Sequence, residues 1–430
     1  MGIFLQLALD FVDLSRALLV AESAMAAGAD WLEAGTPLIK SEGLNAVREL
    51  RRRFPHHCIV ADMKIMDAGR IEVECAAKAG ANLVDVLGAA SDATIAECIQ
   101  AGKNYGAKIV VDLISVPDPV TRARQVEALG ADYLTVHVAI DDQMVGRDPF
   151  ETLRQVSQAV QIPVGVAGGI NSATAAQAVA SGASYIIVGG AITKAKNPDQ
   201  ATREIRRAID EQVVIPTTLF HRVGAAHIIE ALKQVSAANL SDALHRSGVL
   251  PDIRPVFAGL KVAGRVLTVR TYPGDWAKPV EAIDRAEPGD VIVIDAGGVG
   301  PAVWGELATH SAIQRQVAGV VIHGGLRDAG DIAPLRFPAF SRLVMPNAGE
   351  PKGFGEIGIP IRIGQMTIET GDWLVGDDDG VVVLPQKIAV EYANRAMDVL
   401  ERENRIREEI KSGKTLATVT ELLRWEKKVS

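Results

Sequence analysis

One short stretch, Asp62-Met63-Lys64-Ile65-Met66-Asp67, combines two acids and a lysine within six residues. It continues a β-rich run, and on an extended strand Asp62 and Lys64 point to the same face because they are two positions apart. Asp67 comes after the strand and can reach elsewhere. A carboxylate beside an ammonium suits an enzyme that binds a cation and steadies a negative charge developing next to it. An ion pair on the surface is the alternative for this motif taken alone.

The elements that must position this motif alternate between strands and helices from Ile3 to about Asp210. Eight β-rich runs are each followed by an amphipathic stretch. Eight such units predict a closed (β/α)8 TIM barrel, with an open doubly wound sheet as the alternative. The strand candidates are Phe4–Asp10, Trp31–Gly35, Cys58–Lys64, Leu83–Leu87, Lys108–Ile114, Tyr133–Val138, Pro163–Gly168 and Tyr185–Gly189.

Alternation along these strands predicts which side chains point into the barrel. In the first strand Leu5, Leu7 and Leu9 belong against the helices, so Asp10 points inward at the carboxyl end. Barrel enzymes keep their active sites at this rim, and isolated buried charges are costly, so we expect a catalytic cluster there. Its predicted members are Asp10, Glu33, Asp62, Lys64 and His137, with Asp112 near the end of the fifth strand.

Paired glycines end the last two strands, at Gly168-Gly169 and Gly189-Gly190. Glycine lets backbone N–H groups approach an anion closely, and the start of a following helix adds its positive end. The loops after strands seven and eight are the usual phosphate site of such barrels. A small phosphorylated substrate is therefore expected, and tight turns without a ligand are the alternative.

Several motifs together resemble the orotidine-phosphate decarboxylase superfamily and, within it, the 3-hexulose-6-phosphate synthase family. The resemblance covers essentially the whole first half of the chain. It rests on Leu7-Ala8-Leu9-Asp10, Glu33-Ala34-Gly35-Thr36-Pro37, Asp62 to Gly69, Val86 to Ala90, Val111 to Ile114, Val136 to Asp141 and the two Gly-Gly turns.

That resemblance implies the reversible aldol condensation of ribulose 5-phosphate with formaldehyde. It implies Glu33 and Asp62 as ligands of Mg²⁺, with Mn²⁺ as the alternative, and Lys64 as the charge partner of an enediolate. Removing a proton next to a ketone leaves two oxygens that need such positive partners, and magnesium prefers hard carboxylate oxygens.

The same resemblance implies roles for residues around the metal. Asp10 and Asp112 bind the substrate, and His137 shuttles protons. Asp67 crosses to the partner active site of a dimer. A related family, the 3-keto-L-gulonate 6-phosphate decarboxylases, carries an arginine where Ile140 stands, which favours the aldol enzyme and leaves the decarboxylase as runner-up. A scaffold without catalysis is the competing class.

After Asp210 the periodicity changes. We expect a barrel over residues 1–210, a linker over 211–223 and a second domain over 224–430, in which the strand–helix alternation ends. A compact mixed α/β domain closed by a C-terminal helix is predicted. Its strands are Val262–Tyr272, Val291–Ala296, Val317–His323 and Val381–Leu384, and the helix runs from Lys387 to about Lys411.

In this second half, Glu306 and the dipeptide Arg327-Asp328 are separated by twenty residues. This spacing resembles the RraA-like family (regulator of ribonuclease activity A), which includes class II pyruvate aldolases. The resemblance implies that Asp328 anchors a divalent metal and that Arg327 holds the carboxylate of a pyruvate-type oxo-acid, a task that suits its bidentate guanidinium. Glu306 would order a water, and backbone N–H groups near Leu307 would complete the site.

Two functions of different class stay open for this half. One is a metal-dependent aldolase or decarboxylase of oxo-acids, and the other is a regulatory or oligomerising module. The sequence departs from the family at His323, where an acid often stands, which leaves the local hydrogen bonding open.

Composition bounds the remaining possibilities. A length of 430 residues predicts two domains, and a net charge of −8 without a basic block argues against nucleic-acid and membrane partners. The start lacks the features of a signal peptide, and no apolar run approaches the roughly 18 residues of a membrane helix. The three cysteines read as reduced. We therefore expect a cytoplasmic protein. The family resemblances imply a homo-oligomer, with a dimer through the barrel and, as a further alternative, a trimer through the second domain.

Overall fold

The computed structural model describes residues 2–217, 219–220 and 222–420. It divides into two compact units. The first consists of the residues up to Phe220 together with those from Glu401 onward, and the second consists of the residues between these two parts, up to Leu400. The borders expected at 210 and 224 remain predictions, and nothing in the sequence had indicated that the chain's last part groups with its first. In the described part of the chain, no helix is both long enough and apolar enough to cross a membrane.

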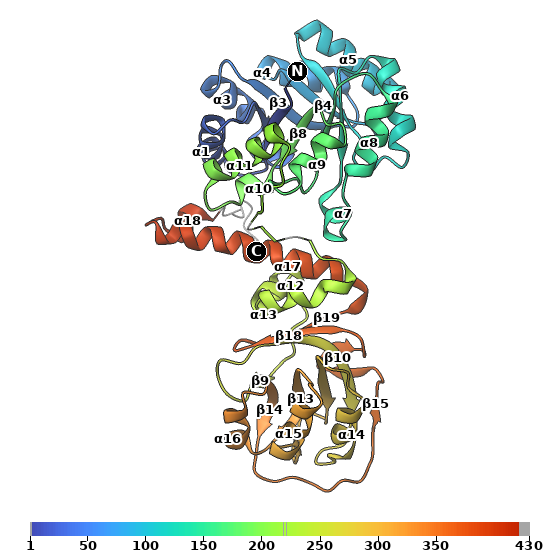
Figure 1. The fold of residues 1–430 in the computed structure, drawn as a ribbon, viewed down its shortest axis with the longest axis vertical. Coiled ribbons are helices and arrows are strands. Elements are labelled where there is room, and N and C mark those ends of the chain that lie inside the picture. Colours follow the sequence, from blue (N-terminus) through green and yellow to red (C-terminus); the bar gives the residue numbers. More distant parts are fainter. Residues whose placement is uncertain (1, 218, 221, 421–430) are drawn as a thin grey trace, which may run out of the picture. The chain divides into compact units, whose positions relative to one another are not determined.

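The first unit contains the predicted closed barrel, in which eight parallel strands pair in sequence order and β8 closes onto β1 (Figure 1). All eight strand predictions are confirmed, with ends that differ by up to two residues. The strands are β1 (Phe4–Leu9), β2 (Trp31–Ala34), β3 (Cys58–Ile65), β4 (Leu83–Leu87), β5 (Lys108–Asp112), β6 (Tyr133–His137), β7 (Val164–Ala167) and β8 (Tyr185–Val188).

Helices surround this barrel. They are α1 (Leu14–Ala26), α2 (Thr36–Glu42), α3 (Asn45–Arg53), α4 (Gly69–Ala79), α5 (Asp92–Tyr105), α6 (Pro119–Leu129), α7 (Ile140–Met144), α8 (Phe150–Ala159), α9 (Ala175–Ala180), α10 (Gly190–Thr193) and α11 (Pro198–Glu211).

The main core lies between the strands and these helices. Leu5, Leu7 and Leu9 of β1 are fully buried in it together with Ala17 and Ala21 of α1, as the alternation predicted. A second, smaller cluster consists of Trp31, Val60, Leu83, Val110 and Tyr185. Most of these residues lie near the amino ends of their strands, so the carboxyl ends are left for polar side chains.

Two Gly-Ala-Asp turns, at residues 28–30 and 130–132, fix neighbouring strands to one another. Asp30 Oδ2 accepts the backbone N–H of Leu5 at 2.8 Å, and Asp132 Oδ2 accepts that of Ile109 at 2.9 Å. Each aspartate precedes a strand and holds the neighbouring strand of the barrel. This repeated contact explains why the turns recur.

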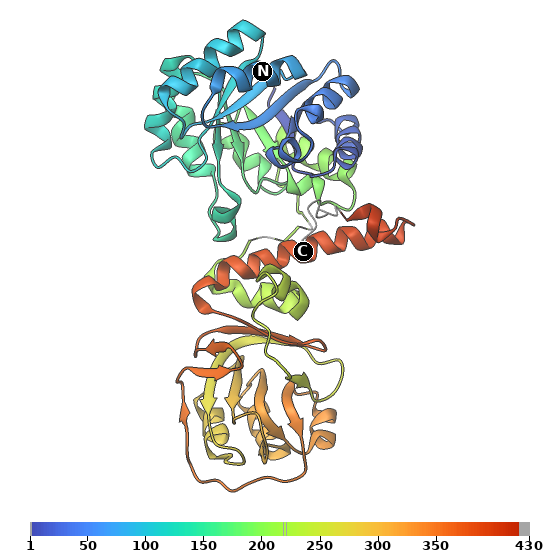
Figure 2. The same ribbon diagram turned by 180° about the vertical axis from the view of Figure 1, so that it is seen from behind.

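The second unit contains a mixed sheet whose central strands β10, β11, β13 and β14 are parallel, with antiparallel strands at both edges (Figure 2). The mixed α/β domain is confirmed. The expectation that strand–helix alternation ends near Gly224 was wrong, because helices α14, α15 and α16 connect these parallel strands. The strands are β9 (Arg254–Pro255), β10 (Val262–Arg270), β11 (Asp290–Asp295), β12 (Ala302–Trp304), β13 (Gly319–Leu326), β14 (Ala339–Val344), β15 (Glu356–Ile357), β16 (Ile361–Ile363), β17 (Met366–Ile368), β18 (Trp373–Asp377) and β19 (Gly380–Leu384).

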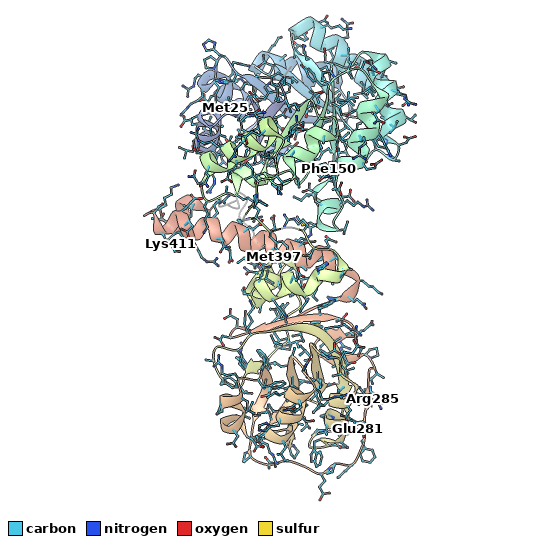
Figure 3. The ribbon with its side chains drawn as sticks, in the orientation of Figure 1. Met25, Phe150, Glu281, Arg285, Met397 and Lys411 are labelled. Atoms are coloured by element: carbon cyan, nitrogen blue, oxygen red, sulfur yellow. The ribbon has the colours of Figure 1, made fainter. Side chains whose placement is uncertain are left out.

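Its helices pack by one face. In α14 the side chains of Ala282 and Ile283 are buried, while Glu281 and Arg285 lie on the outer surface (Figure 3). The long C-terminal helix is confirmed as an element. The helices of this unit are α12 (Ile228–Gln234), α13 (Ala237–Ala243), α14 (Ala277–Arg285), α15 (Glu306–Gln314), α16 (Ala329–Ile332) and the first part of α17 (Ala389–Lys411). The last part of α17, from Glu401, and α18 (Leu416–Val419) belong to the first unit.

Candidate active site

Asp62 and Lys64 form an ion pair at the carboxyl end of β3. Lys64 Nζ lies 2.9 Å from Asp62 Oδ2 and 3.6 Å from Asp112 Oδ2 of β5. The strand is not simply extended here: its pairing with β4 shifts between Ala61 and Ile65, and Lys64 has a φ of 47°. A left-handed non-glycine residue costs about 1–3 kcal/mol and persists only where its surroundings hold it. This irregularity brings the ammonium to two carboxylates.

The charges around Lys64 keep it protonated. Burial lowers its pKa, but the negative charges of Asp62 and Asp112 outweigh burial and hold the pKa of Lys64 above its usual value. Asp62 is itself fixed by Thr36 at the start of α2, whose hydroxyl donates to Asp62 Oδ2 at 2.6 Å. Thr36 had no assigned role in the sequence interpretation.

Glu33 of β2 is almost completely buried, and Gln6 Nε2 of β1 donates to its Oε2 at 2.6 Å. Burial, followed by the charges of Asp62 and Asp10, raises the pKa of Glu33 well above its usual value. One amide hydrogen bond does not compensate these effects. A further positive charge at this position would stabilise the ionised form.

Asp10 follows β1 and lies between two glycines. A Cβ on Gly35 would lie 2.2 Å from Asp10 Oδ1, and a Cβ on Gly189 would lie 3.4 Å from Oδ2. Asp10 is accessible to solvent at the barrel mouth, yet the protein around it removes much of its hydration. This desolvation, followed by the charge of Asp62, raises the pKa of Asp10. Glycine at position 35 therefore leaves the space that Asp10 occupies.

His137 and Asp112 form a second pair. His137 Nδ1 lies 2.8 Å from Asp112 Oδ2, and Asp112 Oδ1 accepts the backbone N–H of Ile114 at 2.9 Å. Burial raises the pKa of Asp112, but the hydrogen bond from His137, the positive charge of Lys64 and the backbone N–H of Ile114 outweigh it and hold the pKa below its usual value. With Nδ1 engaged, Nε2 is the ring nitrogen left to exchange a proton with a substrate.

Asp85 of β4 is a member of this cluster that the sequence interpretation missed. Its side chain is buried, and Oδ1 has no hydrogen-bond partner within the described residues. Burial, followed by the charges of Asp62, Glu33 and Asp112, raises the pKa of Asp85 well above its usual value. The signal was present, because Val84 and Val86 are core residues and alternation places Asp85 on the opposite face.

The excess of carboxylates fits a hard divalent cation. Burial, followed by the charge of Asp62, raises the pKa of both Glu33 and Asp85, and Lys64 supplies one compensating charge. Among the described residues, no three His, Cys, Asp or Glu side chains are arranged as a metal-binding group. Magnesium commonly takes only one or two protein carboxylates and keeps waters or substrate oxygens. Glu33 and Asp62 match that requirement.

Asp67 is not brought into this cluster. It is exposed in the connection between β3 and α4, and in the part of the chain that the structure describes it forms no hydrogen bond or ion pair. Burial, followed by the charge of Asp67, raises the pKa of Glu72. A role in a neighbouring subunit stays a prediction.

The two glycine turns differ in conformation. Gly168 and Gly169 have φ values of 109° and 73°, and a Cβ on Gly168 would lie 2.7 Å from the carbonyl oxygen of Val138. Side chains rarely adopt this conformation, so glycine is needed in this turn. Gly190 instead begins α10, and Lys194 Cε lies 3.6 Å from the position of a Cβ there. Lys194 is thus a cation beside the predicted phosphate turn that the sequence interpretation missed.

The second unit brings Glu306, Arg327 and Asp328 together. Asp328 has a φ of 60°, its Oδ2 accepts the backbone N–H of Glu306 at 3.2 Å, and Arg327 Nε lies 3.3 Å from the same oxygen. Arg327 is 43% exposed and so is open to a ligand. Leu307 follows in the first turn of α15 with an exposed side chain.

His323 of β13, the departure noted above, has a defined partner. Its Nδ1 lies 2.8 Å from Asp295 Oδ1 at the end of β11. A Cβ on Gly298 would lie 2.6 Å from both His323 Nε2 and Arg342 Nη1, so the loop needs glycine there. An acid at position 323 would face Asp295, whereas histidine can donate to it.

Comparison with known proteins assigns both halves of the chain to families. The family described as Orotidine 5'-phosphate decarboxylase / HUMPS matches residues 4–205, and RraA-like, described as Aldolase/RraA, matches residues 237–383. The 3-hexulose-6-phosphate synthase of Mycobacterium gastri is 40% identical over 205 residues, which are 48% of this chain and 99% of that protein. That of Bacillus subtilis (strain 168) is 38% identical over 206 residues, 48% of this chain and 98% of that protein.

A solved structure gives a similar alignment. The crystal structure of a 3-hexulose-6-phosphate synthase is 40% identical and covers 48% of this chain and 100% of its own, with a TM-score of 0.47.

Proposed function

The chain belongs, through its first half, to the orotidine 5'-phosphate decarboxylase / HUMPS family, and from this premise we propose that the barrel is a 3-hexulose-6-phosphate synthase. It joins ribulose 5-phosphate to formaldehyde in a reversible aldol reaction. The observation that carries the proposal is the connected group Asp62–Lys64–Asp112–His137 at the barrel mouth. It holds an ammonium and an imidazole within reach of one substrate.

The proton transfers are assigned to His137. Asp112 holds Nδ1, so neutral Nε2 takes a proton from the hydroxymethyl carbon beside the ketone. The electrons left behind form an enediolate, whose carbon attacks formaldehyde and makes the new carbon–carbon bond. The former carbonyl oxygen of formaldehyde then receives the proton from His137, which returns to its neutral form.

The developing negative charge is assigned to Lys64. Its ammonium is kept protonated by Asp62 and Asp112 and is therefore available as a fixed positive charge beside the enediolate oxygens. Glu33 and Asp62 would hold Mg²⁺, or Mn²⁺, which supplies further positive charge to those oxygens when bound. Asp10 is proposed to bind sugar hydroxyls, and Gly168-Gly169 and Gly189-Gly190 to bind the phosphate through backbone N–H groups.

The test is consumption of ribulose 5-phosphate that depends on formaldehyde. Wild type is expected to be active with Mg²⁺ and inactive with a chelator, and His137→Gln is expected to lose activity. Glu151→Gln is the matched surface control, because Glu151 lies on the outer face of α8 and pairs with Arg154 and Gln155 of the same helix. Carbon dioxide release from 3-keto-L-gulonate 6-phosphate, without the aldol reaction, would favour the decarboxylase instead.

For the RraA-like half we propose a metal-dependent aldolase or decarboxylase of oxo-acids. The convergence of Glu306, Arg327 and Asp328 supports it, because the guanidinium suits a carboxylate and Asp328 suits a divalent metal. The test is pyruvate release from 4-hydroxy-4-methyl-2-oxoglutarate or oxaloacetate, which Asp328→Ala should abolish while leaving the barrel reaction unchanged. If no pyruvate is released at high enzyme and magnesium concentrations, the aldolase or decarboxylase proposal is rejected and the regulatory or oligomerising role is favoured.

A further inference from the structure

Residues 401–420 lie outside the barrel in sequence but belong to its unit. They comprise the last part of α17 and the short helix α18. The curated synthases, matched almost end to end by the first half of this chain, have no counterpart of this segment. Its contacts are therefore an addition to the barrel that these two synthases share with this chain.

One contact reaches the predicted phosphate turn directly. Arg405 Nη1 donates to the carbonyl oxygen of Thr193 at 3.2 Å. Thr193 is the last residue of α10, and its own N–H donates to the carbonyl of Gly189 at 3.0 Å. A helix as short as α10, which spans Gly190–Thr193, is not stable by itself, so its order depends on tertiary contacts: the burial of Ile192 and Thr193 and the contacts to its last carbonyls.

A second group of contacts reaches the loop after β1. Glu409 Oε1 lies 3.5 Å from Arg405 Nε and 2.5 Å from Arg16 Nη2 of α1. The Arg16 guanidinium lies 6.0 Å from the centre of the Phe11 ring, next to Asp10 in sequence. The side chains of Arg16, Arg405 and Glu409 are 13–20% exposed, so water screens these charges less than at an open surface.

The far end of the segment is fixed as well. Arg16 Nη1 donates to the carbonyl oxygen of Val419 at 2.5 Å, and Lys414 Nζ lies 3.1 Å from Glu409 Oε2. Val419 is buried. Arg405 and Arg16 thus connect the segment to the two loops that carry Gly189-Gly190 and Asp10.

We propose that residues 401–420 are a brace that holds the β8 turn in its phosphate-binding conformation, with Arg405 and Glu409 as positioning residues for the substrate's phosphate. The proposal rests on the proposed synthase function for the identity of the ligand. According to this proposal, residues 401–420 increase the affinity of the barrel for its phosphorylated substrate.

The kinetic test compares Arg405→Met with Arg407→Met in the full chain. Arg407 lies two residues away on α17, is half exposed and pairs with Glu403. Losing one charge-assisted hydrogen bond at the turn should raise KM for ribulose 5-phosphate about tenfold with kcat unchanged, because phosphate binding is shared by ground and transition states. Arg405→Lys should recover part of the affinity, and Arg407→Met should match wild type. Equal KM values for Arg405→Met and Arg407→Met would overturn the proposal.

Hydrogen exchange provides a readout that does not need activity. Amides of residues 189–195 in the ligand-free protein should exchange faster in Arg405→Met and Glu409→Gln than in wild type or Arg407→Met. Equal exchange in all four proteins overturns the brace. If wild type has no synthase activity but Arg405→Met still shows faster exchange, the brace is supported and the proposed function is rejected. Failure of the brace and failure of the proposed function can therefore be told apart.

Discussion

Replacing Asp112 by asparagine changes the site by one atom and one charge. Oδ1 can still accept the backbone N–H of Ile114, but an amide NH₂ replaces the oxygen that lies 2.8 Å from His137 Nδ1. A donor there requires Nδ1 to accept, which moves the ring proton to Nε2. The imidazole can then no longer take a proton from the substrate. Lys64 also loses the carboxylate at 3.6 Å but keeps Asp62 at 2.9 Å, so its charge is preserved.

The magnitude follows from the role that is lost. General acid–base catalysis contributes about 10²–10⁴-fold, so kcat for Asp112→Asn should fall by that factor, and loss of the substrate contact predicted for Asp112 would add a rise in KM. Steady-state rates across pH provide the assay, with Glu151→Gln as control. No pH should restore the rate, because the fault is the tautomer. A variant within threefold of wild type, or one rescued at high pH, would refute the assignment of His137.

The Asp112→Asn substitution should also change how the thermal stability of the protein depends on pH. The pKa of folded Asp112 is below its usual value, so its contribution is complete above the unfolded pKa of about 3.9 and is lost as pH falls through the folded value. Wild type should therefore be the more stable protein at neutral pH, and the difference in Tm from Asp112→Asn should shrink below about pH 4.

Three further predictions concern neighbouring positions. Asp85→Asn should raise Tm of the metal-free protein at neutral pH, because it removes a buried carboxyl group whose pKa is raised in the folded protein. This gain in Tm should fade as the pH falls toward the unfolded pKa of aspartate. An unchanged Tm would count against repulsion between the carboxylates. Mixing inactive Asp62→Ala with inactive Asp67→Ala subunits should restore activity if Asp67 serves the partner site, and inactive heterodimers would exclude it. Ile140→Arg, at an exposed position that begins α7, should increase carbon dioxide release from 3-keto-L-gulonate 6-phosphate relative to the aldol rate; an unchanged ratio would show that this position does not separate the two activities.

The barrel and most of its mouth could be predicted because they depend on alternation. Leucines at 5, 7 and 9 identify the outer face of β1, and that choice places Asp10 inward. The Lys64 conformation could not be predicted, since the shift between Ala61 and Ile65 arises from pairing with β4 and leaves no local pattern. Lys64 meets Asp62 through that irregularity.

Other features depend on contacts between distant residues. The parallel strands of the second unit are connected by α14, α15 and α16. α14 is amphipathic, but α15 and the four-residue α16 show little helical period between glycine- and proline-rich turns. The contact of Arg405 with Thr193 joins positions 212 apart, and the sequence pattern of α17 predicts only a packing or oligomer helix. Tertiary packing alone reveals which of its charges are used.

The most direct measurement of the central claim is formaldehyde-dependent consumption of ribulose 5-phosphate by wild type and Asp62→Ala, each with Mg²⁺ and with a chelator. Asp62 pairs with Lys64 and is the proposed partner of Glu33 at the metal, so the substitution removes both functions. The account predicts activity in wild type that the chelator removes, and none in Asp62→Ala under either condition. Undiminished activity of Asp62→Ala would contradict it.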